Sequence, residues 1–374
     1  MRKPKILILS PPLTAVSGFS THANQLMGCS LAQRYELLHF CVGSEGKNES
    51  PLQKLYRLLV SPFSLFWLNI VQRPDIVHIN TGLDRKAYWR DLVYLAVVKL
   101  TGGKIVTQIH GGAMPDQFFP HNAPLTWLLR KGLGASNAVT VLSLKEYDAY
   151  TAFVPEVLVA HIPNAIELPA PLENIKLSDA SQPLRLVYIG RLVREKGIFE
   201  ALNAIAQLHR SGHRLQFDIA GGGKAEEELR KHVVTLGLDK VVHFHGPVFG
   251  NEKTLLWQKA DVLVFPSYSE GLPYSLLEAM AAGTPAITCP VGAIPDVMQH
   301  GVHGLFVPPR DVEAIADAIA SLDGDRALLH RMACASRARV LEQYTTARLG
   351  RDFEMVYEAV LGRDRKPHCG LPPI

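Results

Sequence analysis

A chain of 374 residues is too long for one ordinary hydrophobic core and suits two domains of moderate size. With 47% hydrophobic and 20% charged residues, its composition is typical of a globular protein in water. The net charge of +4 favours phosphorylated ligands or an anionic membrane surface and does not require nucleic acid. The five cysteines are scattered without a CxxC pair, so we expect free thiols in a reducing compartment and no zinc site.

The N-terminus reads as a first strand. The apolar run in KILILS, residues 5–10, ends at a serine and two prolines, and it is too short for the apolar region of a secretory signal. No stretch of 18 uninterrupted apolar residues follows, so we expect no transmembrane helix. The expected location is cytoplasmic, with peripheral contact at the inner membrane face left open.

Short apolar strands alternate with helical segments in two series along the chain. Continuous apolar runs such as ILIL, in the first strand, and VLVF are typical of parallel strands that are buried on both faces. Two βαβ series predict two doubly wound parallel sheets, whose ligands bind in a deep cleft at the carboxyl ends of the strands. We expect domains at 1–168 and 184–351, a polar, proline-bearing linker at 169–183 and a disordered tail at 363–374.

The segment SPLQKLYRLLVSPFSLFWLNIVQRP, residues 50–74, is rich in leucine and aromatic side chains and has cations at its edges. One interpretation is a face for a membrane surface or a lipid acceptor. The other, which we favour, is a helix packed on the first sheet and broken at Pro62. Surface exposure of Phe66 and Trp67 would distinguish the two.

A candidate phosphate site follows the strand LRLVYI, at its carboxyl end. The turn GRLVREKG begins at Gly190 and carries Arg191 and Lys196 just before a helix. An arginine fork and a mobile lysine charge can together clamp a diphosphate. The alternative is a solvated turn with three cations, the third being Arg194.

Gly18 lies between the first strand and its helix, in LTAVSGFSTHA. Backbone N–H groups at a helix N-terminus bind anions, and glycine permits close approach. With a single glycine the dinucleotide fingerprint GxGxxG is not met, which counts against a dehydrogenase.

Glu270 and Glu278 have seven residues between them in SEGLPYSLLEAMAAG. The strand pattern VLVFPS precedes Glu270, so this carboxylate is expected at a strand end, and Glu278 about one turn into the following helix. Phosphates bound at that helix N-terminus would be flanked by two carboxylates that accept hydrogen bonds from sugar hydroxyls. This layout fits a nucleoside diphosphate sugar. The alternative is that Glu278 caps the helix and Glu270 is solvated.

These segments together resemble glycosyltransferase family 4, which consists of retaining enzymes of the GT-B fold. SEGLPYSLLEAMAAGTPAI is similar to the family's E-x7-E signature, and VYIGRLVREKG, IPNAIE, PVGAIPDVMQHGVHGLFVPP and PDIVHIN occur in the family's order. The resemblance covers nearly the whole chain. It also implies that the terminal helix, at about 352–362, packs back on the first domain.

The resemblance implies a role for each matching residue. Glu270 would contact the donor sugar, Glu278 the ribose, and Arg191 and Lys196 the leaving diphosphate, without a metal or other cofactor. His110, in TQIHGG at a strand end, would face the donor sugar and phosphate, although a lone histidine is more often structural. The implied donor-binding residues are Gly18, Gly190, Val248, Gly271, Leu272, Pro273, Tyr274, Ser275 and Glu278.

The sequence departs from the family pattern at uncharged loop positions and at one acidic residue. Ser17 and Ala165 stand where glycines are usual, and Ala293 and Asp296 where the family prefers glycine and glutamate. The expected function is a retaining transfer of a hexose from a UDP- or GDP-sugar to a glycan or lipid-linked acceptor in polysaccharide or glycolipid assembly. The alternative is a catalytically weak nucleotide-sugar-binding subunit of an assembly complex.

Overall fold

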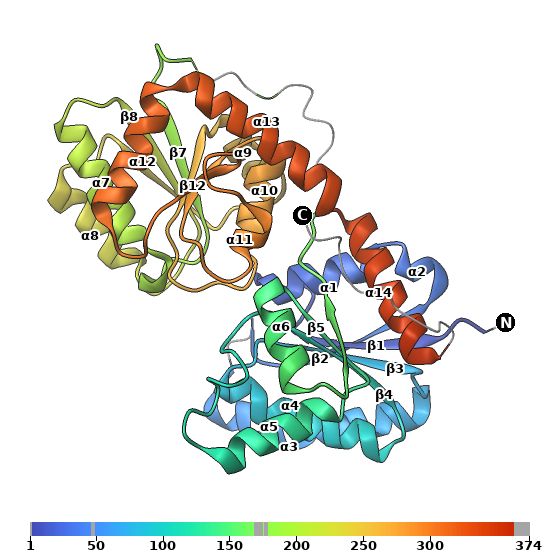
Figure 1. The fold of residues 1–374 in the computed structure, drawn as a ribbon. Coiled ribbons are helices and arrows are strands. Elements are labelled where there is room, and N and C mark those ends of the chain that lie inside the picture. The colour runs from blue at the N-terminus through green and yellow to red at the C-terminus, as the bar shows by residue number, and fades with distance from the viewer. Residues whose placement is uncertain (1, 46–48, 168–174, 176–178, 363–374) are drawn as a thin grey trace. The chain divides into compact units, whose positions relative to one another are not determined.

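The computed structural model describes residues 2–45, 49–167, 175 and 179–362. The chain divides into two compact units (Figure 1). Unit 1 consists of Met1–Glu167 and Thr346–Ile374, and unit 2 consists of Leu168–Thr345. The tail expected at 363–374 and most of the linker expected at 169–183 lie outside the described residues.

Unit 1 is built on a six-stranded parallel sheet in the order β2-β1-β3-β4-β5-β6. Its elements are β1 (Lys5–Ser10), α1 (Gly18–Gly28), α2 (Leu31–Arg34), β2 (Glu36–Cys41), α3 (Pro51–Gln72), β3 (Ile76–Thr81), α4 (Arg85–Leu100), β4 (Lys104–Ile109), α5 (Ala123–Gly134), β5 (Ala138–Val141), α6 (Leu144–Phe153), β6 (Leu158–His161) and α14 (Thr346–Leu361).

Successive side chains of β1 pack into the hydrophobic clusters on opposite faces of this sheet, as its continuous apolar run predicts. Ile8 belongs to the cluster that contains Phe353 of α14, whereas Leu9 belongs to the cluster that contains Leu65 of α3 and Tyr94 of α4. Helices α1, α2 and α14 therefore cover one face of the sheet, and α3 and α4 cover the other (Figure 1).

Unit 2 is built on a second six-stranded parallel sheet, in the order β12-β11-β10-β7-β8-β9. Its elements are β7 (Leu184–Ile189), the short 3-10 helix η1 (Arg194–Lys196), α7 (Ile198–Arg210), β8 (Leu215–Ala220), α8 (Glu226–Leu236), β9 (Val242–Gly246), α9 (Gly250–Lys259), β10 (Val262–Phe265), α10 (Tyr274–Ala282), β11 (Ala286–Thr288), α11 (Ile294–Val297), β12 (Gly304–Phe306), α12 (Val312–Gly324) and α13 (Arg326–Gln343). The predicted fold class of two doubly wound parallel sheets is confirmed.

Helix α3 runs unbroken through Pro62, although we expected a break there. A proline inside a helix removes one backbone hydrogen bond, and the carbonyl group four residues earlier needs another partner. That carbonyl belongs to Leu58, a residue that is 50% exposed. Among the helices of the described residues, none combines the length and the apolar character needed to span a bilayer.

Candidate active site

The loop that carries Glu270 connects β10 to α10 at the carboxyl edge of the second sheet. Two backbone hydrogen bonds fix this loop to its neighbours. The Tyr268 N–H donates to the Glu195 carbonyl at 3.0 Å, and the Ala293 N–H donates to the Gly271 carbonyl at 2.8 Å. The loops after β7, β10 and β11 are therefore joined where these parallel strands end.

Gly292 determines how closely the third of these loops approaches Glu270. Its φ of +59° is in the left-handed region that favours glycine. A Cβ atom at this position would lie 2.1 Å from the Glu270 carbonyl oxygen and 2.5 Å from that of Gly271. Only glycine can hold this loop against the backbone of Glu270.

Glu270 and Lys196 form an ion pair at this edge of the sheet. The Lys196 Nζ lies 2.5 Å from the Glu270 Oε1, and the two side chains are only 11% and 9% exposed. The same ammonium lies 5.7 Å from the centroid of the Phe265 ring. Two residues that are 74 positions apart in the sequence are thus brought into direct contact, as strand-end positions in one parallel sheet allow.

Arg191 is exposed and, unlike its neighbours, forms no ion pair with any described residue. Its carbonyl accepts a hydrogen bond of 2.8 Å from the buried Tyr188 hydroxyl, which anchors the turn after β7. Gly190 leaves the room for this bond, because a Cβ atom there would lie 3.0 Å from the tyrosine oxygen. Arg194, by contrast, is paired with Glu228.

Glu278 lies in the second turn of α10 and pairs with Lys253 of α9 at 2.6 Å. Burial raises the pKa of the neighbouring Tyr274 hydroxyl well above its ordinary value, and the Glu278 charge adds to that rise. Lys253 was not predicted from the sequence. It stands in a polar helical stretch, GNEKTLLWQK, whose pattern does not indicate which helix it faces.

The N-terminus of α10 lies directly behind the Glu270 loop. Pro273 is its N-cap residue with extended backbone, and no side chain of the described residues caps the helix. Leu272 is buried and anchors the loop, and Ser275 occupies the first turn. Val248 follows β9 at the same edge of the sheet and is half-buried.

Gly18 and His110 belong to unit 1, whereas the other candidate residues belong to unit 2. Gly18 is the first residue of α1, and the preceding Ser17 caps this helix by accepting a hydrogen bond from the Ser20 N–H at 3.2 Å. Ser17, which departs from the glycine expected at this position from the sequence resemblance, therefore has a local structural role. It satisfies one of the N–H groups of the first turn of α1.

His110 follows β4 and is fixed by an amide. Its Nε2 lies 2.8 Å from the Asn80 Oδ1, and Asn80 donates through Nδ2 to the Leu9 carbonyl at 3.1 Å. Because that second bond fixes the orientation of the amide, Nε2 of His110 carries the proton and Nδ1 is an acceptor. The Phe19 ring lies 4.8 Å from the imidazole, centroid to centroid.

Two further histidines lie fully buried beside His110. Desolvation lowers the pKa of His22 to about 4 and that of His78 to about 3, and it lowers the pKa of His110 well below its ordinary value. The His22 and His110 rings are 4.7 Å apart. All three are neutral at pH 7, so His110 offers an uncharged acceptor nitrogen.

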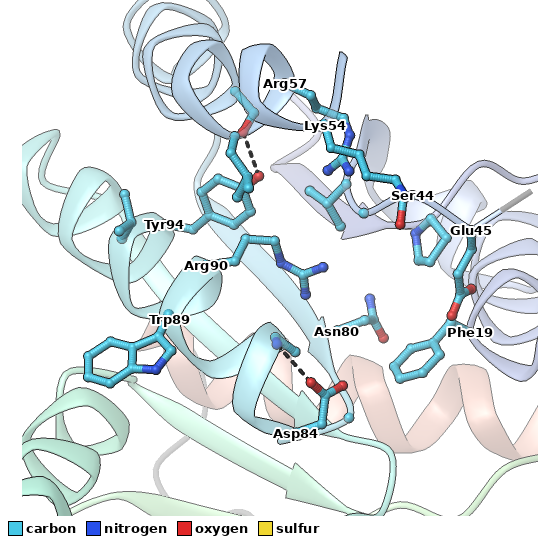
Figure 2. A pocket seen from close by; sticks show the side chains of 18 of the residues that line it. Phe19, Ser44, Glu45, Lys54, Arg57, Asn80, Asp84, Trp89, Arg90 and Tyr94 are labelled. Atoms are coloured by element: carbon cyan, nitrogen blue, oxygen red, sulfur yellow. Dashed lines mark hydrogen bonds between the residues drawn. The ribbon is translucent and has the colours of Figure 1, made fainter. Parts of the chain in front are cut away.

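Unit 1 also contains a pocket of about 670 Å³ close to His110. Asn80 and Phe19, which both contact His110, line it at one end, and Lys54 and Arg57 of α3 line it at the other (Figure 2). In the part of the chain that the structure describes, no group of three or more His, Cys, Asp or Glu side chains is placed to hold a metal ion.

Comparison with known proteins indicates the class of this chain. Residues 173–339 match the model of the family described as glycosyl transferases group 1. The glycogen synthase of Mycobacterium tuberculosis is 29% identical over 311 residues, which cover 80% of this chain and 72% of that protein. The amylovoran biosynthesis glycosyltransferase AmsK of Erwinia amylovora is 31% identical over 178 residues, 46% of this chain and 44% of its own. These findings support a glycosyltransferase.

Solved structures show the same fold. Sucrose-phosphate synthase from Thermosynechococcus elongatus superimposes with a TM-score of 0.78 at 19% identity, covering 97% of this chain and all of that one. HepE of Anabaena, solved in complex with UDP-glucose, gives a TM-score of 0.73 at 16% identity, covering 95% of this chain and 99% of that one. The predicted GT-B architecture of two parallel six-stranded sheets is confirmed.

Proposed function

We propose that the protein is a retaining glycosyltransferase of family 4, which transfers a hexose from a nucleoside diphosphate sugar to a glycan or lipid-linked acceptor. The observation that carries this proposal is the contact between Lys196 and Glu270 at the carboxyl edge of the second sheet. It combines a cation for a phosphate and an acceptor for sugar hydroxyls in one small, largely desolvated site. Glu278 lies further along the same segment, where a ribose is expected.

In this proposal the leaving group is stabilised by side chains alone. As the bond between the anomeric carbon and the phosphate oxygen breaks, negative charge develops on the diphosphate. Arg191 and Lys196, with the N–H groups at the start of α10, stabilise that charge. The acceptor hydroxyl attacks from the side on which the phosphate leaves, its proton passes to the departing phosphate oxygen, and the anomeric configuration is retained. No metal or other cofactor takes part.

His110 is assigned to the donor sugar as a positioning group. Its neutral imidazole offers Nδ1 as a hydrogen-bond acceptor, because Nε2 carries the proton that Asn80 accepts. A histidine whose pKa is lowered so far is a poor general base at pH 7. This agrees with a mechanism in which the phosphate, and not a side chain, accepts the proton.

We propose the donor nucleotide and the biosynthetic process from the proteins that this chain resembles. HepE was solved with UDP-glucose, and several relatives carry names from polysaccharide biosynthesis, so a UDP-sugar is the first donor to test and a GDP-sugar the second. We place the reaction in polysaccharide or glycolipid assembly, at the cytoplasmic face of the membrane.

The experiment is a comparison of two neighbouring arginines. Arg191→Gln should lower turnover by 100-fold or more and weaken UDP binding, because this cation has no described partner and is free for the diphosphate. Arg194→Gln, three residues away, is the matched control and should retain activity, since Arg194 is already paired with Glu228. Equal activity of the two variants would contradict the assignment. Selective donor binding without turnover by the wild type would instead indicate the nucleotide-sugar-binding subunit.

A further inference from the structure

Helix α3 exposes an apolar stripe along its outer face. Leu52, Tyr56, Leu59, Phe63, Trp67 and Ile70 follow one another at intervals of three or four residues, and each is at least 46% exposed. At 1.5 Å per residue the stripe is about 27 Å long. Phe63 and Trp67 are 76% and 68% exposed. Large aromatic side chains in a continuous exposed row mark a surface that another molecule covers.

The stripe lies on the side of α3 that faces away from the pocket, and the exposed side chains of Leu55 and Leu58 lie between the two around the helix. Leu58 of α3 and Val93 of α4 both line the pocket, and they are 50% and 46% exposed on the surface beside it. The two helices are joined by a hydrogen bond of 2.9 Å between the Ser61 and Tyr94 hydroxyls. One ligand can therefore occupy the pocket and extend across Leu58 and Leu55 to the stripe.

The side of the pocket that α3 and α4 form carries positively charged side chains. Lys54 forms no ion pair with any described residue. Arg90 donates through Nε to Asp91 at 2.7 Å, and its guanidinium group points into the pocket (Figure 2). Arg57 is different, because Glu49 binds it through both carboxylate oxygens. Lys54 and the outer edge of Arg90 thus remain as donors for an anion.

The opposite end of the pocket presents groups that suit a sugar. Asp84 and Glu45 line it there, with Asn80, whose amide oxygen is bonded to His110 (Figure 2). Carboxylates and an amide are typical partners of sugar hydroxyls. An apolar stripe, two cations and a sugar-binding end therefore follow one another from α3 to His110.

We infer that this pocket and stripe bind an acceptor in which a sugar is joined through a phosphate to an apolar chain. The chain lies along α3, the phosphate contacts Lys54 and Arg90, and the sugar lies near Asn80 and Asp84. The inference rests on the proposed transferase function and names the class of its acceptor. A neutral glycan would use neither the cations nor the stripe.

Octyl phosphate, kept below its micelle concentration, is the probe. Its dissociation constant is measured by calorimetry, without donor, beside those of octyl glucoside and inorganic phosphate. We expect octyl phosphate to bind at least 10-fold more tightly than either. Equal binding of octyl glucoside would overturn the phosphate contact, and equal binding of inorganic phosphate would overturn the contact with the apolar chain.

Four variants locate the site. Lys54→Gln should weaken octyl phosphate about 10-fold, whereas Lys99→Gln, an exposed lysine of α4, should not. We choose Lys54 because its substitution breaks no ion pair with a described residue, so a change in binding reports on the ligand contact. Arg90→Gln would instead leave the buried Asp91 without its ion-pair partner and could disturb the fold. Trp67→Ser should weaken binding several-fold, and Trp127→Ser, an exposed tryptophan of α5, should not.

Two further outcomes would overturn the inference. One is that Lys54→Gln has no effect on octyl phosphate binding. The other is a wild-type dimer that Trp67→Ser dissociates, which would assign the stripe to a second copy of the chain. Arg191→Gln separates this test from that of the proposed function. It should lower donor turnover by 100-fold or more and leave octyl phosphate binding unchanged.

Discussion

The buried histidines of unit 1 should make its stability depend on pH. Both His22 and His78 have folded-state pKa values, about 4 and about 3, below the value of 6.5 of an exposed imidazole. The unfolded chain therefore binds more protons below pH 6.5, and stability is lost as the pH falls from about 6.5 toward 4. Above pH 7 both imidazoles are neutral in the folded and in the unfolded chain, so they make no pH-dependent contribution to stability.

The size of the effect follows from these pKa values. At pH 5 the pH is about 1.5 units below the pKa of an imidazole in the unfolded chain, whereas the folded groups stay almost unprotonated. At about 1.36 kcal/mol per unit, protonation therefore stabilises the unfolded chain by about 2 kcal/mol for each histidine. His22 and His78 together should cost about 4 kcal/mol between pH 7.5 and pH 5. His110 acts in the same direction. This loss is large against a typical domain stability of about 5–15 kcal/mol.

Urea unfolding at the two pH values measures this loss, with amide exchange in β3 and β4 identifying the transition of unit 1. His78→Gln is the test variant, because an amide can accept from Tyr357 and donate to Gln108 as the imidazole does. It should reduce the pH-dependent loss by about 2 kcal/mol, whereas His209→Gln, at an exposed position in unit 2, should not. The same pH-dependent loss in all three proteins would refute the reasoning.

Three further predictions concern unit 2. Glu270→Gln should destabilise this unit by about 3–5 kcal/mol in urea unfolding, because Lys196 is left buried without its partner. The double variant Glu270→Gln with Lys196→Met should recover part of that loss. Additive effects of the two substitutions would argue against coupling. Gly292→Ala should reduce donor hydrolysis by displacing the Glu270 backbone, whereas Gly301→Ala, also at positive φ but in open space, should retain activity; equal activity would contradict the role of the close approach. Lys253→Met should change the melting temperature little, since the pair is partly exposed, but raise the KM for the donor several-fold; an unchanged KM would remove Lys253 from the site.

The sequence was sufficient for the fold and for the placement of the strand-end residues. Continuous apolar runs such as residues 5–10 and 262–265 become parallel strands, and the loop that follows each run is at the same edge of its sheet. For this reason Glu270 could be expected at a strand end from its position after VLVFPS alone. The roles of the site residues stay predictions until a donor is tested.

Contacts between distant segments could not be derived in the same way. Neither the pairing of Lys253 with Glu278 nor the placement of Arg90 in a pocket leaves a periodic signal, because each depends on how helices turn about their axes. The course of α3 through Pro62 was also wrong in the sequence interpretation. A proline's local penalty was outweighed there by packing of the helix on the sheet through Leu65.

The central claim is that the chain is a retaining, metal-independent transferase that uses a nucleoside diphosphate sugar. One measurement tests it most directly: proton NMR of the purified protein with UDP-, GDP- or ADP-glucose in EDTA, following the anomeric signals. The account predicts slow release of α-glucose from one of these α-linked donors, before mutarotation. Initial release of β-glucose, or release only after a divalent metal is added, would contradict it.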